Sequence, residues 1–202
     1  MKNVMNNSKK VFLMVALLAT VMGYANESSF YISKNDDNRT TLTLTDVKVG
    51  NLFSIKDENG IILYKEAIQE TGIYTKGFDL TALPNGNYFF ELDKDMEITT
   101  IPFSVSNREV TFEKELSETT FKPVTVVKGD LILVTQLSLN EKPLEIEVYY
   151  EGGNYRNPSQ LIHSETISNT KNIKRVYKLY NLKKGDYKIV YKTDGREFVE
   201  YI

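Results

Sequence analysis

The chain has 202 residues, no cysteine and a formal net charge of −2. Three of its lysines lie within the first ten residues, so the rest of the chain is more acidic still, and it offers no basic field to displace counterions from phosphates. We therefore expect no nucleic-acid partner. Without cysteine the chain forms no disulfides, and its stability must come from an apolar core, which its 41% of hydrophobic residues can supply.

The N-terminus has the features of an export signal. Lys2, Lys9 and Lys10 precede an apolar run from Val11 to Met22, and Gly23-Tyr24-Ala25 closes the run with small residues at the two positions that a signal peptidase reads. The alternative is a membrane anchor, but the run is shorter than the roughly 20 apolar residues that a spanning helix needs. We expect a mature chain without a transmembrane segment, located in the periplasm, at the cell surface or outside the cell.

The residues after the signal are polar as far as Asn38, and only Phe30–Ile32 offers a possible short edge strand. This segment is interpreted as a tail. Thr41–Thr45 then alternates polar and apolar residues with the period of two that predicts a strand.

A hairpin is predicted next. The β-rich runs Leu52–Ile55 and Ile61–Tyr64 flank Asp57-Glu58-Asn59-Gly60, and Asn-Gly between such runs is a strong hairpin signal. With further strand signals at Ile73–Leu80 and Arg108–Glu113, about seven strands occur at the spacing typical of a β-sandwich.

The stretch Phe78–Val105 carries the most informative pattern. Leu83-Pro84-Asn85-Gly86 predicts a tight turn in which Gly86 takes a positive φ. Alternation from Tyr88 onward predicts a strand with one buried face. Pro102 interrupts the following run, which predicts a sheet edge or a bulge.

The same pattern returns in Lys178–Ile202, with Thr193-Asp194-Gly195 as its later turn. The corresponding residues are Leu83, Gly86, Tyr88, Phe90 and Leu92 in the first copy and Leu182, Gly185, Tyr187, Ile189 and Tyr191 in the second. Between the copies, Glu115–Lys122 shows no apolar periodicity and indicates a linker. The strands expected after it are Val124–Val127, Leu131–Val134, Leu144–Tyr150, Leu161–Ser164 and Arg175–Tyr180. Almost no helix is expected, because no window has three-four apolar spacing over a helical length.

The two motifs Leu83–Tyr88 and Leu182–Tyr187 resemble the L-P-x-G-x-Y signature of small immunoglobulin-like sandwich domains in secreted Bacteroidota proteins, including the C-terminal sorting domains of the type IX secretion system. The resemblance implies that Tyr88 and Tyr187 are structural, since a related tyrosine in fibronectin-type and immunoglobulin domains makes a corner in which the phenol bonds upstream backbone. Glu197 and Glu200 depart from sorting domains, which tend to carry lysines there.

The sequence therefore predicts an all-β protein with two tandem immunoglobulin-like (fibronectin-like) antiparallel β-sandwich domains. The expected division is a signal peptide (1–25), a polar N-terminal tail (26–38), a first sandwich (39–113), a linker (114–123) and a second sandwich (124–202). Whether the two domains share a core is left open, as is the oligomeric state.

Few residues offer chemistry. His163 is the only histidine and has no cysteine or second histidine as a partner, so a packed or solvated side chain is favoured over a metal ligand. Asp93, Asp95 and Glu97 alternate across a turn and are candidate calcium ligands, although their spacing lacks the full calcium-hand loop and favours solvated carboxylates.

Tyr149, Tyr150 and Tyr155 lie near Gly152-Gly153 and are candidates for an aromatic platform that binds a sugar or a peptide. Packing on a sheet is the favoured alternative, because tyrosine is a common strand residue and the chain has no tryptophan.

No serine lies in a Gly-x-Ser-x-Gly elbow and no glycine-rich phosphate loop joins a strand to a helix, so we expect no enzyme and no cofactor. The expected function is that of a secreted or periplasmic structural or interaction protein that binds a protein or a cell-envelope component through sheet edges and loops. Two alternatives remain, a type IX secretion cargo whose C-terminal domain is a sorting signal and a carbohydrate- or peptide-binding module.

Overall fold

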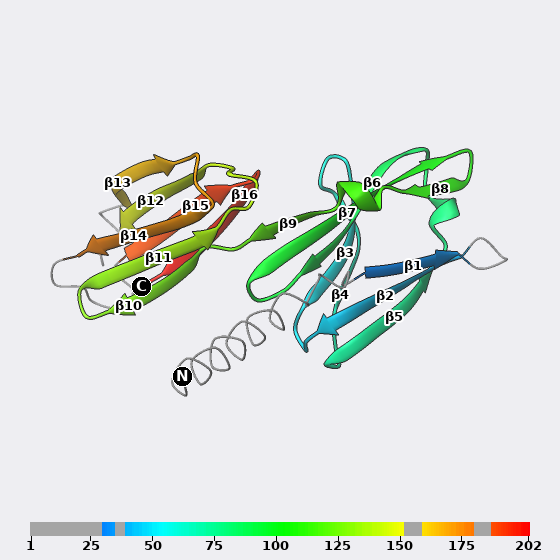
Figure 1. Cartoon of the computed structure of the whole chain (residues 1–202), viewed down its shortest axis with the longest axis horizontal. Helices are drawn as coiled ribbons and strands as arrows, with labels where there is room; N and C mark the ends of the chain where they lie inside the picture. The colour runs from blue at the N-terminus through cyan, green and yellow to red at the C-terminus, as the bar shows by residue number, and fades with distance from the viewer. Residues whose placement is uncertain (1–29, 35–38, 152–158, 180–186) are drawn as a thin grey trace, which may run out of the picture.

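The computed structural model describes residues 30–34, 39–151, 159–179 and 187–202 (Figure 1). Strands make up 68% of these residues and 3-10 helices 4%, which confirms the predicted all-β fold. The strands form several antiparallel sheets, as expected of β-sandwiches. No described helix is long and apolar enough to cross a membrane. The proposed signal peptide lies outside the described residues.

The first unit, residues 30–121, contains two sheets. The smaller has the order β1 (Phe30–Lys34), β2 (Thr40–Val47), β5 (Gly72–Phe78). The larger has the order β4 (Ile62–Ala67), β3 (Leu52–Asp57), β6 (Gly86–Asp93), β7 (Glu97–Ser106), β8 (Glu109–Phe112), with β9 (Glu118–Phe121) also paired to β7. Two 3-10 helices, η2 (Leu80–Ala82) and η3 (Lys114–Leu116), connect strands.

The second unit, residues 124–202, repeats this arrangement. One sheet has the order β10 (Val124–Lys128), β11 (Leu131–Leu137), β14 (Asn172–Lys178), and the other β13 (Gln160–Ile167), β12 (Leu144–Tyr150), β15 (Tyr187–Thr193), β16 (Arg196–Tyr201). In both units the first, second and fifth strands, counted along the chain, form one sheet. In the second sheet of each unit the fourth, third, sixth and seventh strands lie side by side in that order. Strands of the two units can therefore be compared pair by pair.

Each unit encloses its own hydrophobic cluster. The first is rich in aromatic rings, and Phe53 and Phe90 are fully buried with ring centroids 5.6 Å apart. The second is mainly aliphatic around fully buried Ile146, Ile189 and Tyr191. Burial of such side chains stabilises each unit by roughly 1.5–3 kcal/mol per residue.

An equivalent polar cluster joins the fourth and fifth strands in both units. In the first, Tyr74 Oη donates to Glu66 Oε2 at 3.0 Å and Lys76 Nζ donates to the same oxygen. Hydrogen bonds from Lys76 and Tyr64 lower the pKa of Glu66 to about 2. Burial raises the pKa of the Tyr74 phenol, which therefore stays a hydrogen-bond donor.

In the second unit, Tyr177 Oη donates to Glu165 Oε1 at 2.5 Å, and Arg175 Nε donates to Glu165 Oε2 at 2.8 Å. Burial alone would raise the pKa of Glu165, but the hydrogen bonds from Tyr177 and Arg175 outweigh it and lower the value. Both clusters tie the two sheets of a sandwich together along one side.

Residues 30–34, interpreted as part of a polar tail with a possible short edge strand at Phe30–Ile32, form the edge strand β1. All five pair with β2, Phe30 belongs to the first core, and Lys34 Nζ donates to the carbonyl of Val110 in the other sheet. The boundary drawn at residue 39 leaves this strand out of the sandwich. Five residues are too few to show a periodicity, so the burial of Phe30 depends on the sheet it meets.

The segment 114–123, expected to be a linker, contains η3 and β9. β9 pairs with β7 from Glu97↔Phe121 to Thr100↔Glu118, so it belongs to the larger sheet of the first unit. Only residues 122 and 123 separate it from β10 in the second unit.

Pro102 lies inside β7 rather than on an edge strand. β7 pairs with β9 as far as Thr100 and with β8 from Phe103, so Pro102 falls where the outer neighbour changes. Its carbonyl points outward and accepts from Glu113 N at 3.0 Å. The N–H and C=O of a strand residue point to the same side, so the side on which proline lacks an N–H is the side that faces away from β6. The hydrogen bonds between β6 and β7 are therefore all retained.

Candidate functional site

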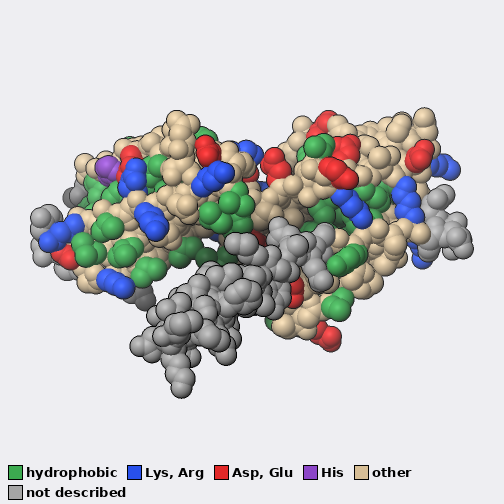
Figure 2. Space-filling model, in the orientation of Figure 1, with side chains coloured by type: hydrophobic (Ala, Val, Ile, Leu, Met, Phe, Trp, Pro, Cys, Tyr) green, Lys and Arg blue, Asp and Glu red, His purple; other side chains and the backbone are tan. Residues whose placement is uncertain are grey.

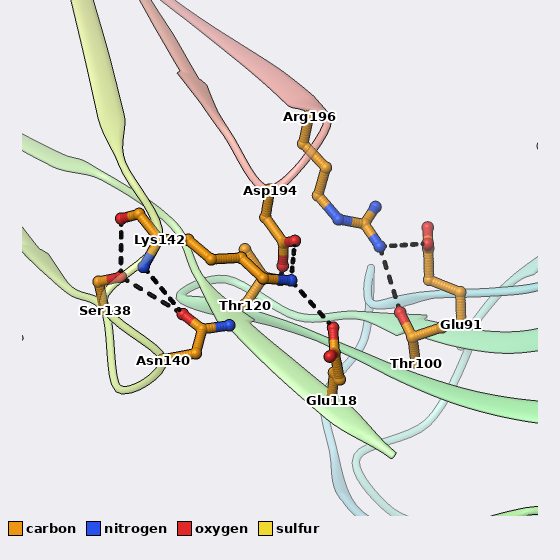
Figure 3. Close-up of polar contacts among 9 residues, drawn as sticks. All are labelled: Glu91, Thr100, Glu118, Thr120, Ser138, Asn140, Lys142, Asp194 and Arg196. Carbon is orange, nitrogen blue, oxygen red and sulfur yellow. Dashed lines mark hydrogen bonds and ion pairs between the residues drawn. The ribbon is translucent and has the colours of Figure 1, made fainter. Parts of the chain in front are cut away.

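The β15–β16 hairpin places its tip against the larger sheet of the first unit (Figure 3). Asp194 and Gly195 form the turn with φ of 53° and 68°, the left-handed pair of a type I′ hairpin. This confirms the predicted turn. Asp194 and Arg196 point from the tip toward the first unit and form a polar junction (Figure 3). We call this set the interdomain junction: Glu91, Thr100, Glu118, Thr120, Lys142, Asp194 and Arg196.

Glu91 is the centre of one half of the junction. Its Oε2 accepts from Arg196 Nη2 at 2.8 Å, its Oε1 accepts from Lys56 Nζ at 2.7 Å, and the residue is only 7% exposed. Arg196 also donates to Thr100 Oγ1 at 3.2 Å. Burial alone would raise the pKa of Glu91, but the hydrogen bonds from Arg196 and Lys56 outweigh it, so the pKa is lowered and the carboxylate stays ionised.

Asp194 is the centre of the other half. It accepts from Thr120 Oγ1 of β9 and from Lys142 Nζ, and the Lys142 amino group lies 3.2 Å from Glu118 Oε2. Burial would raise the pKa of Asp194, but the bonds from Lys142 and Thr120 lower it, while the Asp194 bond raises the pKa of Lys142. A further link between units runs from Gln136 Nε2 to the Phe121 carbonyl at 2.8 Å.

A groove of about 550 Å³ opens at this junction, with walls that include Lys56, Phe89 and Pro102 from the first unit and Gly195 from the second. Glu91 is buried and Asp194 half-buried, and both are paired with cations and have lowered pKa values, so they are weak bases and are not proton donors near neutral pH. These bonds form a polar contact between the two units.

The Tyr88 motif forms the expected corner. Tyr88 Oη donates to the carbonyl of Pro84 at 2.8 Å, and the ring stacks on Phe103 at 5.4 Å. Leu83 packs against the first core. The predicted positive φ at Gly86 is wrong, because Gly86 begins β6 in an ordinary strand conformation and pairs with Val105.

Gly86 instead leaves room for the tyrosine. A Cβ there would lie 3.5 Å from Tyr88 Oη and 3.6 Å from its Cε2, so the ring passes directly over the glycine on its way to Pro84. In the second copy, Leu182 and Gly185 lie outside the described residues. Tyr187 begins β15 and packs against Tyr150 at 5.4 Å.

The three acidic calcium candidates do not converge. Asp93 pairs with Lys122 at 2.5 Å, Asp95 with Lys48 at 3.6 Å, and Glu97 with Lys94 at 3.6 Å. The described residues contain no group of three acidic or histidine side chains placed to hold a metal.

The candidate aromatic platform is only partly described, because Tyr155 lies outside the described residues. Tyr149 Oη donates to Glu147 at 2.8 Å, and Lys188 Nζ lies over the Tyr149 ring, 4.6 Å from its centroid. Tyr150 is 39% exposed beside Tyr187. One ring face of Tyr149 is therefore covered by a cation, which leaves less aromatic surface for a sugar.

His163 lies in β13 beside the Glu165 cluster. Its Nε2 is 3.5 Å from Glu165 Oε1, and its ring centroid is 5.4 Å from that of Tyr177. The histidine therefore packs beside the Tyr177 ring and the Glu165 carboxylate at the side of the sandwich.

A surface that the sequence did not reveal lies on the outer side of β10, β11 and β14. We call it the aliphatic face and define it by six outward side chains: Val124, Val126, Leu131, Leu133, Leu137 and Val176. Three of them lie directly opposite one another, since Leu133 pairs with Val126 on one side and Val176 on the other. Val126 is 45% and Val176 63% exposed. Figure 2 shows hydrophobic side chains gathered over these strands, with basic side chains among them.

The first unit shows that the fold does not require this face. The corresponding row across β1, β2 and β5 is Tyr31, Thr43 and Thr75, and the two threonine hydroxyls are hydrogen-bonded at 3.2 Å. A signal was present in the sequence, because Leu131–Val134 is a continuous apolar run. Such a run predicts a strand buried on both faces, whereas only one face of β11 is covered in the described structure.

No protein-family model matches the sequence, and a comparison with curated proteins gives no match either.

Proposed function

We propose that this protein is an exported, non-catalytic interaction protein made of two immunoglobulin-like sandwiches, and that the aliphatic face of the second unit binds a protein or cell-envelope partner. The observation that carries the proposal is the row Val126, Leu133 and Val176, in which both valines are exposed and the leucine between them is half-buried. Contiguous exposed aliphatic side chains are costly in water and in native proteins often mark interaction sites.

The interdomain junction supports this function by fixing where the face lies. The ion pairs Arg196–Glu91 and Lys142–Glu118, together with the short connection after β9, hold the second unit against the first. Because the two units are held together, the aliphatic face has one orientation relative to the first unit. This reduces the conformational entropy that is lost when a partner binds.

The sorting-signal alternative has less support. Both units have the same strand order, including the internal one, so the shared motif is accounted for by the architecture. A blot of fractionated cells separates these alternatives, because a sorted cargo accumulates outside the outer membrane.

Site-specific photo-crosslinking in the native cells tests the aliphatic face. A photoreactive residue at Val176 should give one dominant adduct, while the same residue at Thr75, the corresponding position of the first unit, should give none. Equal adduct patterns at the two positions would show that the aliphatic face has no special partner.

A further inference from the structure

The charges on the aliphatic face identify the chemistry of its partner, and this step rests on the function proposed above. β10, β11 and β14 contain no aspartate or glutamate. Lys128 and Lys178 flank Leu131 in one row, and Lys174 lies beside Thr135 in another, so three lysines share the outer side with the aliphatic residues. Asp130, in the adjoining turn, pairs with Lys178 at 3.5 Å. This is a basic surface on a chain whose net charge is negative.

The face ends at a cavity between the two units. This seam cavity has a volume of about 230 Å³, and its lining includes Met96, Phe121, Val124, Gln136, Leu137 and Ile173. Val124 and Leu137 belong to both the face and the cavity, so the two surfaces are continuous. A cavity of this size is too small for most small-molecule ligands, but it can take a single apolar side chain as an anchor.

We propose that the aliphatic face binds an acidic protein segment. Apolar side chains of the segment cover Val126, Leu133 and Val176, one of them enters the seam cavity, and its carboxylates lie beside Lys128 and Lys174. Charge complementarity of this kind orients a partner and increases its association rate.

Two other occupants fit less well. A second copy of the chain, packed face to face, would bring the three lysines of each face close to one another, and like charges at an interface are unfavourable. An anionic membrane is usually recognised by clusters of about four to eight basic residues, more than the three present here, and it has no side chain to fill the seam cavity.

Selection from a phage-displayed library of random peptides against the purified protein tests the proposal. Enriched peptides should combine apolar residues with aspartate or glutamate. Leu133→Thr with Val176→Thr, which installs the residues of the first unit, should weaken the binding of a synthetic copy of an enriched peptide about tenfold or more. Lys128→Glu with Lys174→Glu should weaken it similarly and remove its salt dependence. Val199→Thr, which changes an exposed valine of β16, is the matched control and should bind as wild type does.

The remaining outcomes contradict the proposal in distinguishable ways. Binding lost with the threonine pair but not with the glutamate pair would keep the aliphatic face as a binding site and reject an acidic partner. Enrichment of basic or uncharged peptides, binding insensitive to both pairs, or no enrichment would reject it too. Light scattering that shows a dimer dissociated by the threonine pair would assign the face to a second copy, and binding to anionic vesicles would assign it to a membrane. Circular dichroism of each variant verifies that it folds.

Discussion

Arg196 of the second unit and Glu91 of the first, 105 positions apart in the chain, form an ion pair of 2.8 Å. The arginine side chain is 24% exposed and the glutamate side chain 10%, and Lys56 provides a second cation to the same carboxylate. This contact joins two sandwiches that have separate hydrophobic cores, so the junction should couple their unfolding.

Replacing Arg196 by methionine should lower the free energy of unfolding by about 2 kcal/mol, because a charged hydrogen bond to a buried carboxylate is lost. Urea unfolding followed by circular dichroism measures the change. Lys48→Met is the control, since the Lys48–Asp95 pair is exposed and should contribute little. Equal effects of the two substitutions would show that the junction does not stabilise the protein.

Stability should fall in acid through Glu91 and Asp194. Folding lowers the pKa of both carboxyls below their unfolded values of about 4.3 and 3.9. Their contribution is therefore fully present above the unfolded values and is lost as the pH falls through the lower, folded ones. Urea midpoints measured from neutral pH to about pH 3 should drop more steeply for wild type than for Glu91→Gln. Parallel curves would exclude this source of acid sensitivity.

The corner hydrogen bond can be removed without changing the core. Tyr88→Phe should cost about 1 kcal/mol, the usual net value of one hydrogen bond, because the Pro84 carbonyl loses its donor. Thermal unfolding measures the loss. A neutral result would mean that water replaces the phenol at no cost.

Substitutions at Gly86 distinguish space from backbone strain. Gly86→Ala should be tolerated, because the new Cβ would make ordinary contact with the Tyr88 ring. Gly86→Val should displace that ring and cost about 1–3 kcal/mol. If alanine were as damaging as valine in the same unfolding assay, the backbone rather than the tyrosine would be the constraint.

Calcium should not stabilise the protein. Asp93, Asp95 and Glu97 pair with three different lysines, so a calcium ion would have to break those pairs to gather its ligands. The midpoint of thermal unfolding should be the same with millimolar calcium and with a chelator. A rise with calcium that is absent in Asp93→Asn would restore these residues as ligands.

Most strands were predictable because their signals are local. Leu144–Tyr150 matches β12 as predicted, and the Asp194-Gly195 turn follows from the two residues themselves, since few others accept two successive positive φ values. The repeat was also readable, because Tyr88 and Tyr187 occupy corresponding positions in β6 and β15.

The sequence by itself determined an all-β chain with hairpins, a repeated strand pattern and a tyrosine corner, since each depends on residues close together along the chain. Only the tertiary structure decided that β1 and β9 join the first unit, that Arg196 meets Glu91, and that one side of β11 is exposed. Alternation and turn residues indicate which segments form strands. The pairing of a short strand, an ion pair between units and an uncovered apolar face each depend on which distant segment lies opposite, so no local pattern predicts them.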